Sequence, residues 1–432
     1  MELNNKKVIN GWALYDWANS AYFLVISTAV FPAYFIAKTN ATIDFFGISA
    51  KNSTIYSLAV SAAYLFVVLL SPILSGIADF GGRRMFFLKL FTYIGSISCV
   101  SMFFFTGEYD VWIGVGAFVF ATIGAAGSLV FYDSYLPEIA TEDQFDKISA
   151  KGYSYGYFGS VLLLVFILVM SMYPSIFGIP ENSSLPYRIG FALVGLWWMG
   201  FAQITFNRLP VGKTQKFNVT LIKKGIEKVN NVLIKILKNR NLSIYLLSVF
   251  FFNAGVQTVI YLASVFAKEV LNFDTKELIV IILIIQIIGI LGAYVFAWIS
   301  LKIGNKSGLA LMILIWTLIT IAAYFVEQKI QFYILSGLVG LVLGGIQSQA
   351  RATYSKLVES DKKELTSYFS FFEIMLKLSI VSGTFAFGIV NQITGNLRTS
   401  VISLVFFFVG GLIFLLFSDF KKAKLKVEEA GI

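Results

Sequence analysis

The sequence lacks histidine, contains a single cysteine and carries few charges. Without histidine, imidazole metal sites are excluded, and any proton relay has to use aspartate or glutamate. The single cysteine, Cys99, lies within an apolar run, which excludes a disulfide framework and argues against thiol redox chemistry. Charged residues make up 13% of the 432 residues, against about 25% in soluble domains. That is too few to cover a globule of this size, so we expect the outer surface to face lipid.

The motifs that carry enzymatic chemistry are also missing. The sequence has no nucleotide-binding loop, no paired carboxylates in a soluble segment and no cluster of metal ligands. The nucleophile–base arrangements of an intramembrane enzyme are not visible either. We therefore expect that the chain is not an enzyme, that it holds no cofactor or metal, and that it does not drive transport with ATP by itself.

The sequence is rich in hydrophobic residues, which make up 57% of the total. Runs of about 20 apolar residues recur from end to end, and each is long enough to cross a hydrocarbon core of about 30 Å as a helix. They predict an all-α integral membrane protein with twelve transmembrane helices. The approximate limits of these spans are 11–37, 55–78, 86–105, 110–134, 150–173, 187–206, 242–266, 277–301, 308–326, 331–355, 366–391 and 397–417.

The basic residues indicate how these spans are oriented. An even number of spans puts both termini on one side, and with the termini inside, 25 of the 34 lysines and arginines fall on the inner side and 7 on the outer. This excess predicts cytoplasmic termini. It also explains the net charge of +10 without a nucleic-acid partner. The first span is too long for a cleavable signal peptide, and no targeting segment is visible, which favours a bacterial inner membrane.

The longest connection, residues 207–241, separates six spans from six. We predict an N-terminal six-helix bundle (1–206), a basic amphipathic linker (207–241) and a C-terminal six-helix bundle with a short basic tail (242–432). Apolar residues recur in the linker at helical spacing, with lysines elsewhere on the wheel. Two interpretations stay open: a helix with a regulatory role on the anionic inner leaflet, or a simple tie between the bundles.

The two halves of the chain carry a weak internal repeat. Ser75–Arg84 follows the second span and Ala297–Lys306 follows the eighth. The fourth and tenth spans each end in a run of small residues that leads to a charge, over Gly124–Asp133 and Gly340–Arg351. Repeated halves in a helical membrane protein are typical of transporters.

The loop after the second span resembles the signature of the major facilitator superfamily, Gly-x-x-x-Asp-Arg/Lys-x-Gly-Arg/Lys-Arg/Lys. Asp79, Gly82, Arg83 and Arg84 match it, whereas a serine replaces the first glycine and Phe80 replaces a basic residue. The resemblance implies two pseudo-symmetric six-helix bundles that alternate access to a central cavity, lined by spans one, four, seven and ten. It assigns the four matching residues to a conformational latch between the bundles. The alternative is a basic inner loop that only sets topology.

A narrower resemblance covers nearly the whole chain and rests on four further stretches. They are Trp12–Tyr22, Asp133–Ile139, Asn253–Gln257 and Gly344–Arg351. Together they resemble the family of autophagy-related vacuolar amino-acid effluxers and their bacterial relatives. That family implies the export of amino acids. The superfamily's proton-coupling arginine has no counterpart in residues 110–131, which puts standard proton antiport in doubt.

Intramembrane polar residues are the candidates for binding a substrate or a coupling ion. Asp16 costs roughly 2.5–3.5 kcal/mol to place in a membrane helix, and such carboxylates usually face a cavity. Asp16 and Asn19 share a helix face and could bind a substrate ammonium, a proton or a sodium ion; alternatively they are a structural polar pair. Glu373 and Lys377 are spaced as a self-satisfying ion pair, and a network of Asp16, Glu373 and Lys377 is a further possibility.

Three neutral amides complete the set of candidates: Asn253, Gln257 and Gln347. Amides can bond a substrate carboxylate or amine, or they can join one helix to another. The sequence thus predicts a secondary active transporter of a small solute, with efflux of neutral amino acids as the best candidate and a proton or sodium ion as the possible coupling partner. The alternatives are transport of another small metabolite, and a non-transporting membrane sensor or scaffold on a transporter fold.

Overall fold

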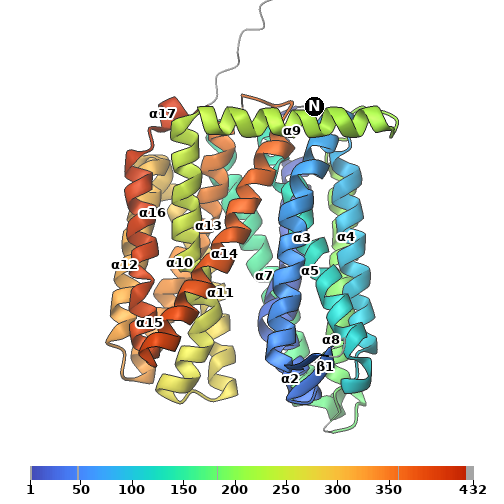
Figure 1. Cartoon of the computed structure of the whole chain (residues 1–432), viewed down its shortest axis with the longest axis vertical. Coiled ribbons are helices and arrows are strands. Elements are labelled where there is room, and N and C mark those ends of the chain that lie inside the picture. The colour runs from blue at the N-terminus through green and yellow to red at the C-terminus, as the bar shows by residue number, and fades with distance from the viewer. Residues whose placement is uncertain (1, 46–47, 182, 359, 425–432) are drawn as a thin grey trace, which may run out of the picture.

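The structure is a computed structural model that describes residues 2–45, 48–181, 183–358 and 360–424 (Figure 1). Within these residues, twelve helical segments are long and apolar enough to cross a membrane, which confirms the predicted integral membrane fold. Ten spans are single helices or nearly so. They are α3 (Asn52–Gly81), α4 (Arg84–Ser101), α5 (Val111–Asp133), α7 (Phe145–Met172), α8 (Leu185–Arg208), α10 (Arg240–Leu271), α11 (Thr275–Ile303), α12 (Asn305–Tyr324), α13 (Lys329–Val358) and α14 (Leu365–Thr394).

The first span is composite: α1 (Lys6–Ala21), the π-helix η1 (Tyr22–Val30) and α2 (Phe31–Lys38) follow one another. Pro32, in the first turn of α2, has no N–H to donate, and in a continuous α-helix its ring would clash with the carbonyl four residues earlier. The wider π-helical turns accommodate this, and the Thr28 hydroxyl donates to the Phe23 carbonyl at 2.8 Å. Such π-helical segments are frequent at functional sites.

The last span is also broken, at Leu404, into α15 (Leu397–Ser403) and α16 (Val405–Phe417). Five short helices lie between spans or extend one of them, and one follows the last span. They are η2 (Met102–Phe104), η3 (Glu108–Asp110), α6 (Leu136–Ile139), η4 (Glu142–Gln144), η5 (Pro174–Phe177) and α17 (Phe420–Ala423). The predicted limits differ most, by five residues, at three places: the first span begins at Lys6 rather than 11, the fifth begins at Phe145 rather than 150, and the seventh ends at Leu271 rather than 266.

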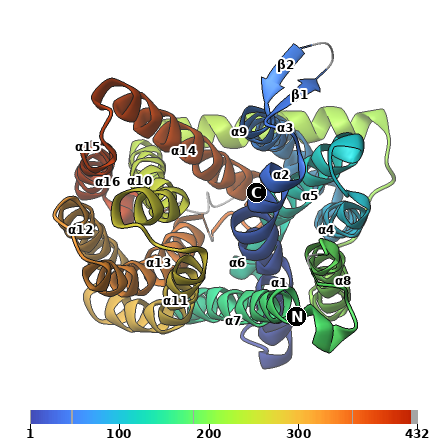
Figure 2. The ribbon, with the colours of Figure 1, turned by 90° about the horizontal axis from the view of Figure 1, so that it is seen from below.

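The spans pack around two hydrophobic cores. One core holds buried side chains from Val8 to Leu221, together with Ala352, and the other holds those from Val232 to Leu415. We call the two groups of helices the N-terminal and the C-terminal bundle. Figure 2 shows them side by side, with α7 beside α11 and α3 beside α14 where they meet.

Besides the short helices, two larger features lie outside the spans, a pair of strands and one long helix. The strands β1 (Thr42–Phe45) and β2 (Ile48–Lys51) pair antiparallel, with Thr42 opposite Lys51; the sequence did not predict this small addition to the all-α fold, which is confirmed. This hairpin lies at the end of the molecule opposite to the N-terminus and to α17 (Figure 1). We call the end with the start of α1 and with α17 the terminal side and the end with the hairpin the far side.

The second element, α9 (Val219–Lys238), lies across the terminal side, perpendicular to the spans (Figure 1). Its Leu221 belongs to the first core, and its Val232 and Ile236 belong to the second. At Gly225 the helix touches the backbone of α3 at Gly76, where a side chain on either residue would not fit. The amphipathic linker therefore packs on both bundles.

Candidate functional site

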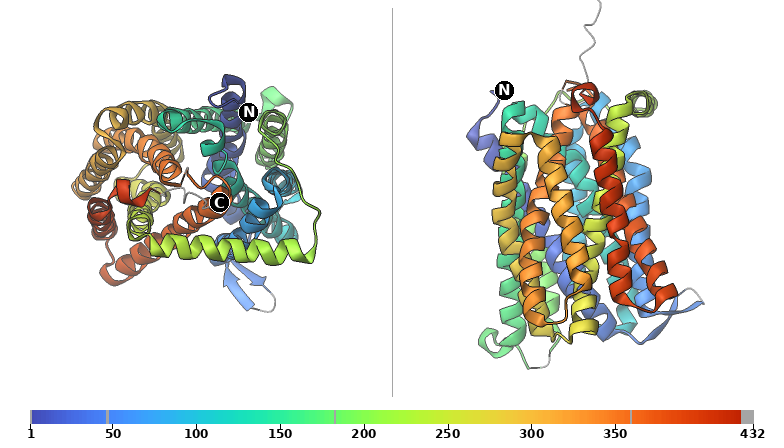
Figure 3. Two further views of the ribbon diagram at one scale, coloured as in Figure 1. Left: turned by 90° about the horizontal axis from the view of Figure 1, so that it is seen from above. Right: turned by 90° about the vertical axis from the view of Figure 1, so that its left-hand side faces the viewer.

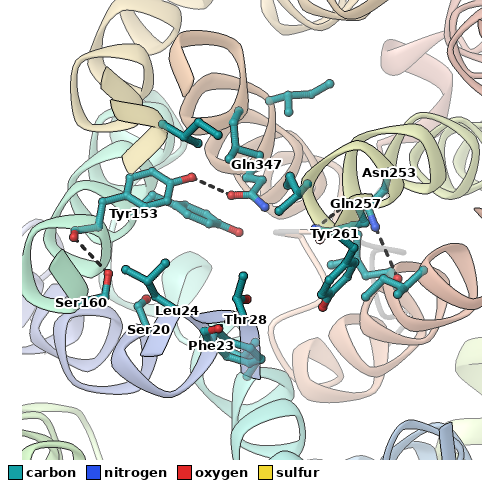
Figure 4. A pocket seen from close by; sticks show the side chains of 18 of the residues that line it. Ser20, Phe23, Leu24, Thr28, Tyr153, Ser160, Asn253, Gln257, Tyr261 and Gln347 are labelled. Carbon is teal, nitrogen blue, oxygen red and sulfur yellow. Dashed lines mark hydrogen bonds between the residues drawn. The ribbon is translucent and has the colours of Figure 1, made fainter. Parts of the chain in front are cut away.

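A cavity of about 260 Å³ lies between the two bundles. The close-up in Figure 4 shows polar side chains of both bundles turned toward it, among them Ser20, Tyr153, Gln257 and Gln347. Spans one, seven and ten line it, as the superfamily resemblance implies, but span four contributes only Leu129 and Asp133. The helices α7, α11 and α14 supply much of the remaining wall. All seven of the predicted binding residues line this cavity: Asp16, Asn19, Asn253, Gln257, Gln347, Glu373 and Lys377.

Asp16 is buried at the terminal side of the cavity, with 6% of its surface exposed. Its Oδ2 atom accepts hydrogen bonds from the Tyr132 hydroxyl at 2.9 Å and from Arg351 Nη2 at 3.0 Å. Its ion-pair partner is therefore an arginine in α13, and not Glu373 or Lys377 of α14. The three-residue network that we considered from the sequence does not form around Asp16 in this state.

Arg351 crosses from the C-terminal bundle to three helices of the N-terminal bundle. Besides Asp16 of α1, its guanidinium pairs with Asp133 of α5 at 3.0 Å and donates to the hydroxyl and carbonyl of Ser149 in α7 at 3.0 and 3.1 Å. It also lies over the ring of Tyr153, 4.3 Å from the centroid. A planar guanidinium with several fixed donors suits such a site better than lysine would.

Sequence reasoning missed both Arg351 and Asp133 as site residues, although a signal was present. They end the two small-residue runs of the internal repeat, Gly124–Asp133 and Gly340–Arg351, and they carry opposite charges at corresponding places. In two halves related by an axis along the membrane normal, corresponding residues next to the axis meet. The structure brings these two residues together as an ion pair.

Gly152 of α7 makes room for this ion pair. A Cβ atom at this position would lie 2.8 Å from Arg351 Nη2 and would also overlap the Asp16 carboxylate. Gly156 and Gly159 likewise allow α7 to approach Ser20 and Trp17 of α1 closely. The glycines of α7 thus bring α1 close enough for Asp16 to reach Arg351.

The predicted latch joins the bundles at one corner of the terminal side. The Asp79 carboxylate, at the end of α3, accepts from the backbone N–H groups of Thr366 and Ser367 at 3.1 and 2.7 Å. It therefore caps the N-terminus of α14 in the other bundle, where unpaired N–H groups and the helix dipole favour an anion. Arg84 donates to the Thr366 hydroxyl at 2.9 Å and pairs with Glu138.

The other two predicted latch residues serve the linker instead. Gly82 ends α3 in the left-handed region, at φ +65°, with the Lys213 carbonyl packed against it. Arg83 turns away from the bundle interface and donates through Nε to the Gln215 carbonyl at 3.1 Å. The structure thus places Asp79 and Arg84 between the bundles, and Gly82 and Arg83 against the segment that leads into α9.

A second polar contact lies at the start of α7. Asp146 is fully buried there, accepts from Asn305 Nδ2 at 2.6 Å and forms an ion pair with Lys356. Lys356 also donates to Asn305 Oδ1 at 2.8 Å. Asn305 lies in Ala297–Lys306, the segment that repeats the Asp79 loop, so both loops contact the opposite bundle. Sequence reasoning did not identify Asp146 or Lys356.

The remaining predicted residues divide between binding and packing contacts. Glu373 Oε2 lies 2.8 Å from Lys377 Nζ, as the spacing predicts, but without hydrogen-bond geometry. Gln347 accepts from the Tyr157 hydroxyl at 2.7 Å, across the bundle interface (Figure 4).

Two amides are satisfied within their own bundle. Asn253 donates to the Ser379 hydroxyl at 2.6 Å, and Asn19 donates to the Ser128 hydroxyl at 3.0 Å. Gln286 of α11 also lines the cavity.

The polar contacts make this state asymmetric between its two sides. Among the described residues, the hydrogen bonds and ion pairs that join the bundles lie on the terminal side or at the level of the cavity, from Asp79 and Asp146 to Tyr157. The terminal side is therefore closed by Arg351, by the latch and by the Asp146 contact. Opening it requires all three to break.

Comparison with known proteins identifies the kind of molecule. A family model described as "Vacuole effluxer Atg22 like" matches residues 4–428. An uncharacterized MFS-type transporter of Bacillus subtilis, YxiO, is 28% identical over 418 residues, which are 94% of each chain. Autophagy-related protein 22 of Kluyveromyces lactis is 25% identical over 389 residues, or 82% of this chain and 77% of that protein. The chain matches only 48% of the corresponding protein of Cryptococcus neoformans.

Solved structures agree in fold. The major facilitator superfamily transporter FucP in its outward conformation has a TM-score of 0.64 at 13% identity, covering 96% of this chain and 98% of that one. A bacterial homologue of the iron transporter ferroportin, in an outward-facing state, has a TM-score of 0.67 at 13% identity, covering 95% and 98%. The proton:xylose symporter XylE reaches 0.67 at 15% identity, covering 96% and 95%.

The buried ion pairs predict the effect of removing the arginine. Arg351→Ala leaves Asp16 and Asp133 without their cation, and breaking a buried pair in this way costs about 3–5 kcal/mol. We expect a clear fall in the thermal unfolding midpoint of the purified protein. The combined change Arg351→Met, Asp16→Asn and Asp133→Asn removes the charges together and should recover most of the loss. A single change that leaves the midpoint unaltered would contradict the pairing.

The close approach at Gly152 predicts a second effect. Alanine normally stabilises a helix relative to glycine by up to about 1 kcal/mol, but Gly152→Ala pushes a methyl group into the Asp16–Arg351 pair. We expect a lower unfolding midpoint for Gly152→Ala. Gly200→Ala in α8, where a methyl group meets no atom within 4 Å, is the matched control and should be neutral or stabilising. Equal behaviour of the two variants would show that the pair tolerates the methyl group.

Proposed function

The chain belongs to the Atg22-like vacuole effluxer family and is a transporter of the major facilitator superfamily, and we propose that it exports neutral amino acids by alternating access. The observation that carries this proposal is the charge of the cavity. Asp16, Asp133 and Glu373 face two cations, Arg351 and Lys377, so the lining carries one excess negative charge. A solute with an ammonium group and a carboxylate complements such a lining better than a multivalent anion does.

The size of the cavity supports a small solute. Its volume of about 260 Å³ lies just below the range of roughly 300–1,000 Å³ that holds drug-sized ligands. Between the charged groups, the amides of Gln257 and Gln347 and the hydroxyl of Tyr261 offer neutral hydrogen-bond partners. These can hold polar ends of a zwitterion without adding further buried charge, while apolar residues such as Phe23 and Ile285 accept a neutral side chain.

The contacts of Arg351 suggest how binding and export are coupled. When the terminal side opens, Asp16 and Asp133 separate from Arg351 and are left as two uncompensated carboxylates. These attract an ammonium group that enters from that side. When the terminal side closes, Arg351 competes for the same oxygen atoms, and the solute is released toward the far side. A solute can shift the equilibrium between the open and closed states only by the difference in its affinity for them. The competition with Arg351 supplies such a difference.

We place the terminal side in the cytoplasm, because most lysines and arginines lie on that side. The far side is then the outside. A bacterial cell membrane is the proposed location, since the bacterial relative matches over 94% of both chains. On the terminal side, the lysines of α9 make anionic lipids the proposed membrane partner. A proton or a sodium ion is the proposed coupling ion, held by the same carboxylates in exchange for the ammonium.

The test uses the purified protein in two steps. A panel of metabolites is first screened for a rise in the thermal unfolding midpoint, and the hits are then measured as exchange in proteoliposomes. We expect neutral amino acids to stabilise the protein and to exchange. Asp16→Asn should reduce exchange at least ten-fold, because it removes a charge that binds the ammonium, whereas Asp44→Asn in the exposed hairpin should not.

Three results would count against the proposal. Stabilisation by organic anions alone would point to another substrate class. Normal exchange by Asp16→Asn at every pH would remove Asp16 from coupling. Absence of any stabilising solute, together with full tolerance of Asp16→Ala, would favour a sensor or scaffold. The dependence of exchange on a pH gradient or a sodium gradient identifies the coupling ion.

A further inference from the structure

The helix α9 has three faces rather than two. At 3.6 residues per turn, its buried face contains Leu221, Gly225, Val229, Val232 and Ile236, which pack on the bundles. Roughly 100° to one side runs a second apolar stripe, which the bundles leave largely uncovered. Its members are Val219, Ile222, Ile226, Leu233 and Leu237, of which Val219 and Leu237 are more than 60% exposed.

The opposite flank is basic. Lys224, Lys228, Lys235 and Lys238 lie roughly 100° to the other side of the buried face, and Lys223 lies at the edge of the apolar stripe. The end of this flank at Lys235 contacts protein, whereas Lys223 and Lys224 stay exposed. A helix with acyl chains on its apolar stripe and headgroups at its exposed lysines would carry this division of side chains. Water alone gives no reason for the apolar stripe.

The position of α9 fits a membrane surface. Figure 1 shows the helix at the ends of the spans, perpendicular to them, and Figure 3 shows it along the outer edge of the molecule. It packs on α3, whose Leu65 and Leu69 are exposed on the outer surface of the spans. The apolar stripe therefore has acyl chains within reach, and the lysines complement anionic headgroups above them.

The same helix is bound into the closed terminal side. Lys235 Nζ lies 2.8 Å from Asp361 Oδ2 and 2.6 Å from Glu364 Oε2, directly before the first turn of α14. Asp79 of α3 caps that same turn. Burial alone would lower the pKa of Lys235, but hydrogen bonds to Asp361 and Glu364 raise it overall, so the lysine stays charged at neutral pH.

The segment before α9 is tied to the latch loop as well. Gln215 N–H donates to the Gly81 carbonyl at 3.0 Å, and the Gln215 carbonyl accepts from Arg83. The end of α3, the helix α9 and the start of α14 thus form one junction. When the bundles rock apart on the terminal side, α14 has to leave both Asp79 and Lys235.

We propose that α9 is a strap whose contact with anionic phospholipid favours the state in which the terminal side is closed. Lipid phosphates bind Lys223, Lys224 and Lys228, the apolar stripe enters the acyl region, and the helix is held where Lys235 meets Asp361 and Glu364. Each lysine near an anionic surface changes binding by about five-fold, and salt weakens the effect. The inference rests on the proposed function only in requiring two alternating states.

The experiment measures conformation without any transported solute. Cys99 is buried and is replaced by alanine, and spin labels are attached at Asn207→Cys and Ser307→Cys, two exposed positions on the terminal side of different bundles. The full-length protein is reconstituted in phosphatidylcholine vesicles with or without phosphatidylglycerol. We expect the long distance of the open terminal side to be several-fold more populated in phosphatidylcholine alone.

Variants assign the effect to α9. The triple change Lys223→Gln, Lys224→Gln and Lys228→Gln should remove the response to phosphatidylglycerol. The matched control Lys6→Gln, Lys7→Gln and Lys421→Gln removes the same charge from exposed positions of the terminal side and should keep the response. Lys235→Gln should populate the long distance in both kinds of vesicle, because it frees α14 from the strap.

The outcomes separate this inference from the proposed function. Identical distance distributions in both vesicles, or an unchanged response in the α9 triple variant, would overturn the strap while leaving amino-acid export intact. A single distance under every condition, Lys235→Gln included, would contradict alternating access itself. If the protein does not exchange amino acids but its distances respond normally to phosphatidylglycerol, the proposed role of α9 is supported and amino-acid export is not.

Discussion

The rest of the closed terminal side depends on one buried cation. Arg351 projects from α13 into the N-terminal bundle and holds Asp16 and Asp133 at 3.0 Å each. Two carboxylates and a guanidinium with almost no solvent exposure are expensive to desolvate, and they are tolerable only when every partner is in place. That requirement fixes the approach of α1, α5 and α7 to α13. It also explains why a glycine stands at 152, where a methyl group would fall within the ion pair.

Around this centre, the repeated loops of the two halves of the chain each form a polar contact between the bundles, but with different residues. On one corner a carboxylate of the first repeat, Asp79, caps a helix of the other bundle. On the other corner the corresponding loop supplies Asn305, and the carboxylate, Asp146, lies on the opposite helix with Lys356 as its cation. The repeat keeps the places of the contacts, but the carboxylate lies at the end of the helix before the loop at the first corner and on the helix opposite the loop at the second, so the N-terminal bundle carries it at both. Both corners and Arg351 close the same side, so that side opens as a unit.

The cavity and the contacts that close the terminal side share residues, and the proposed transport mechanism depends on this sharing. Asp16, Asp133 and Arg351 line the cavity and at the same time join the bundles. A solute that binds these carboxylates competes with the contact that closes the terminal side. In a protein whose gate and binding site were separate, such competition would need a path of coupled contacts. Here the carboxylate oxygens of Asp16 and Asp133 pair with Arg351 and are also the proposed binding partners of the solute.

The sequence by itself determined the number of spans and identified the intramembrane polar residues whose presence needs a reason. It also predicted that the termini lie in the cytoplasm. Hydrophobic length identifies a membrane helix because each helix satisfies its own backbone within lipid, and the energetic cost of an intramembrane carboxylate drew attention to Asp16. The Glu373–Lys377 pair was readable because one helix turn sets its geometry. The π-helix at Tyr22–Val30 and the hairpin at Thr42–Lys51 were not predicted, since neither leaves a distinct hydropathy pattern. Only the tertiary structure decided that Asp16 meets Arg351, 335 residues away, and that Arg83 serves the linker. Which helices touch depends on the shapes of whole helix surfaces, and no local spacing in the chain records that.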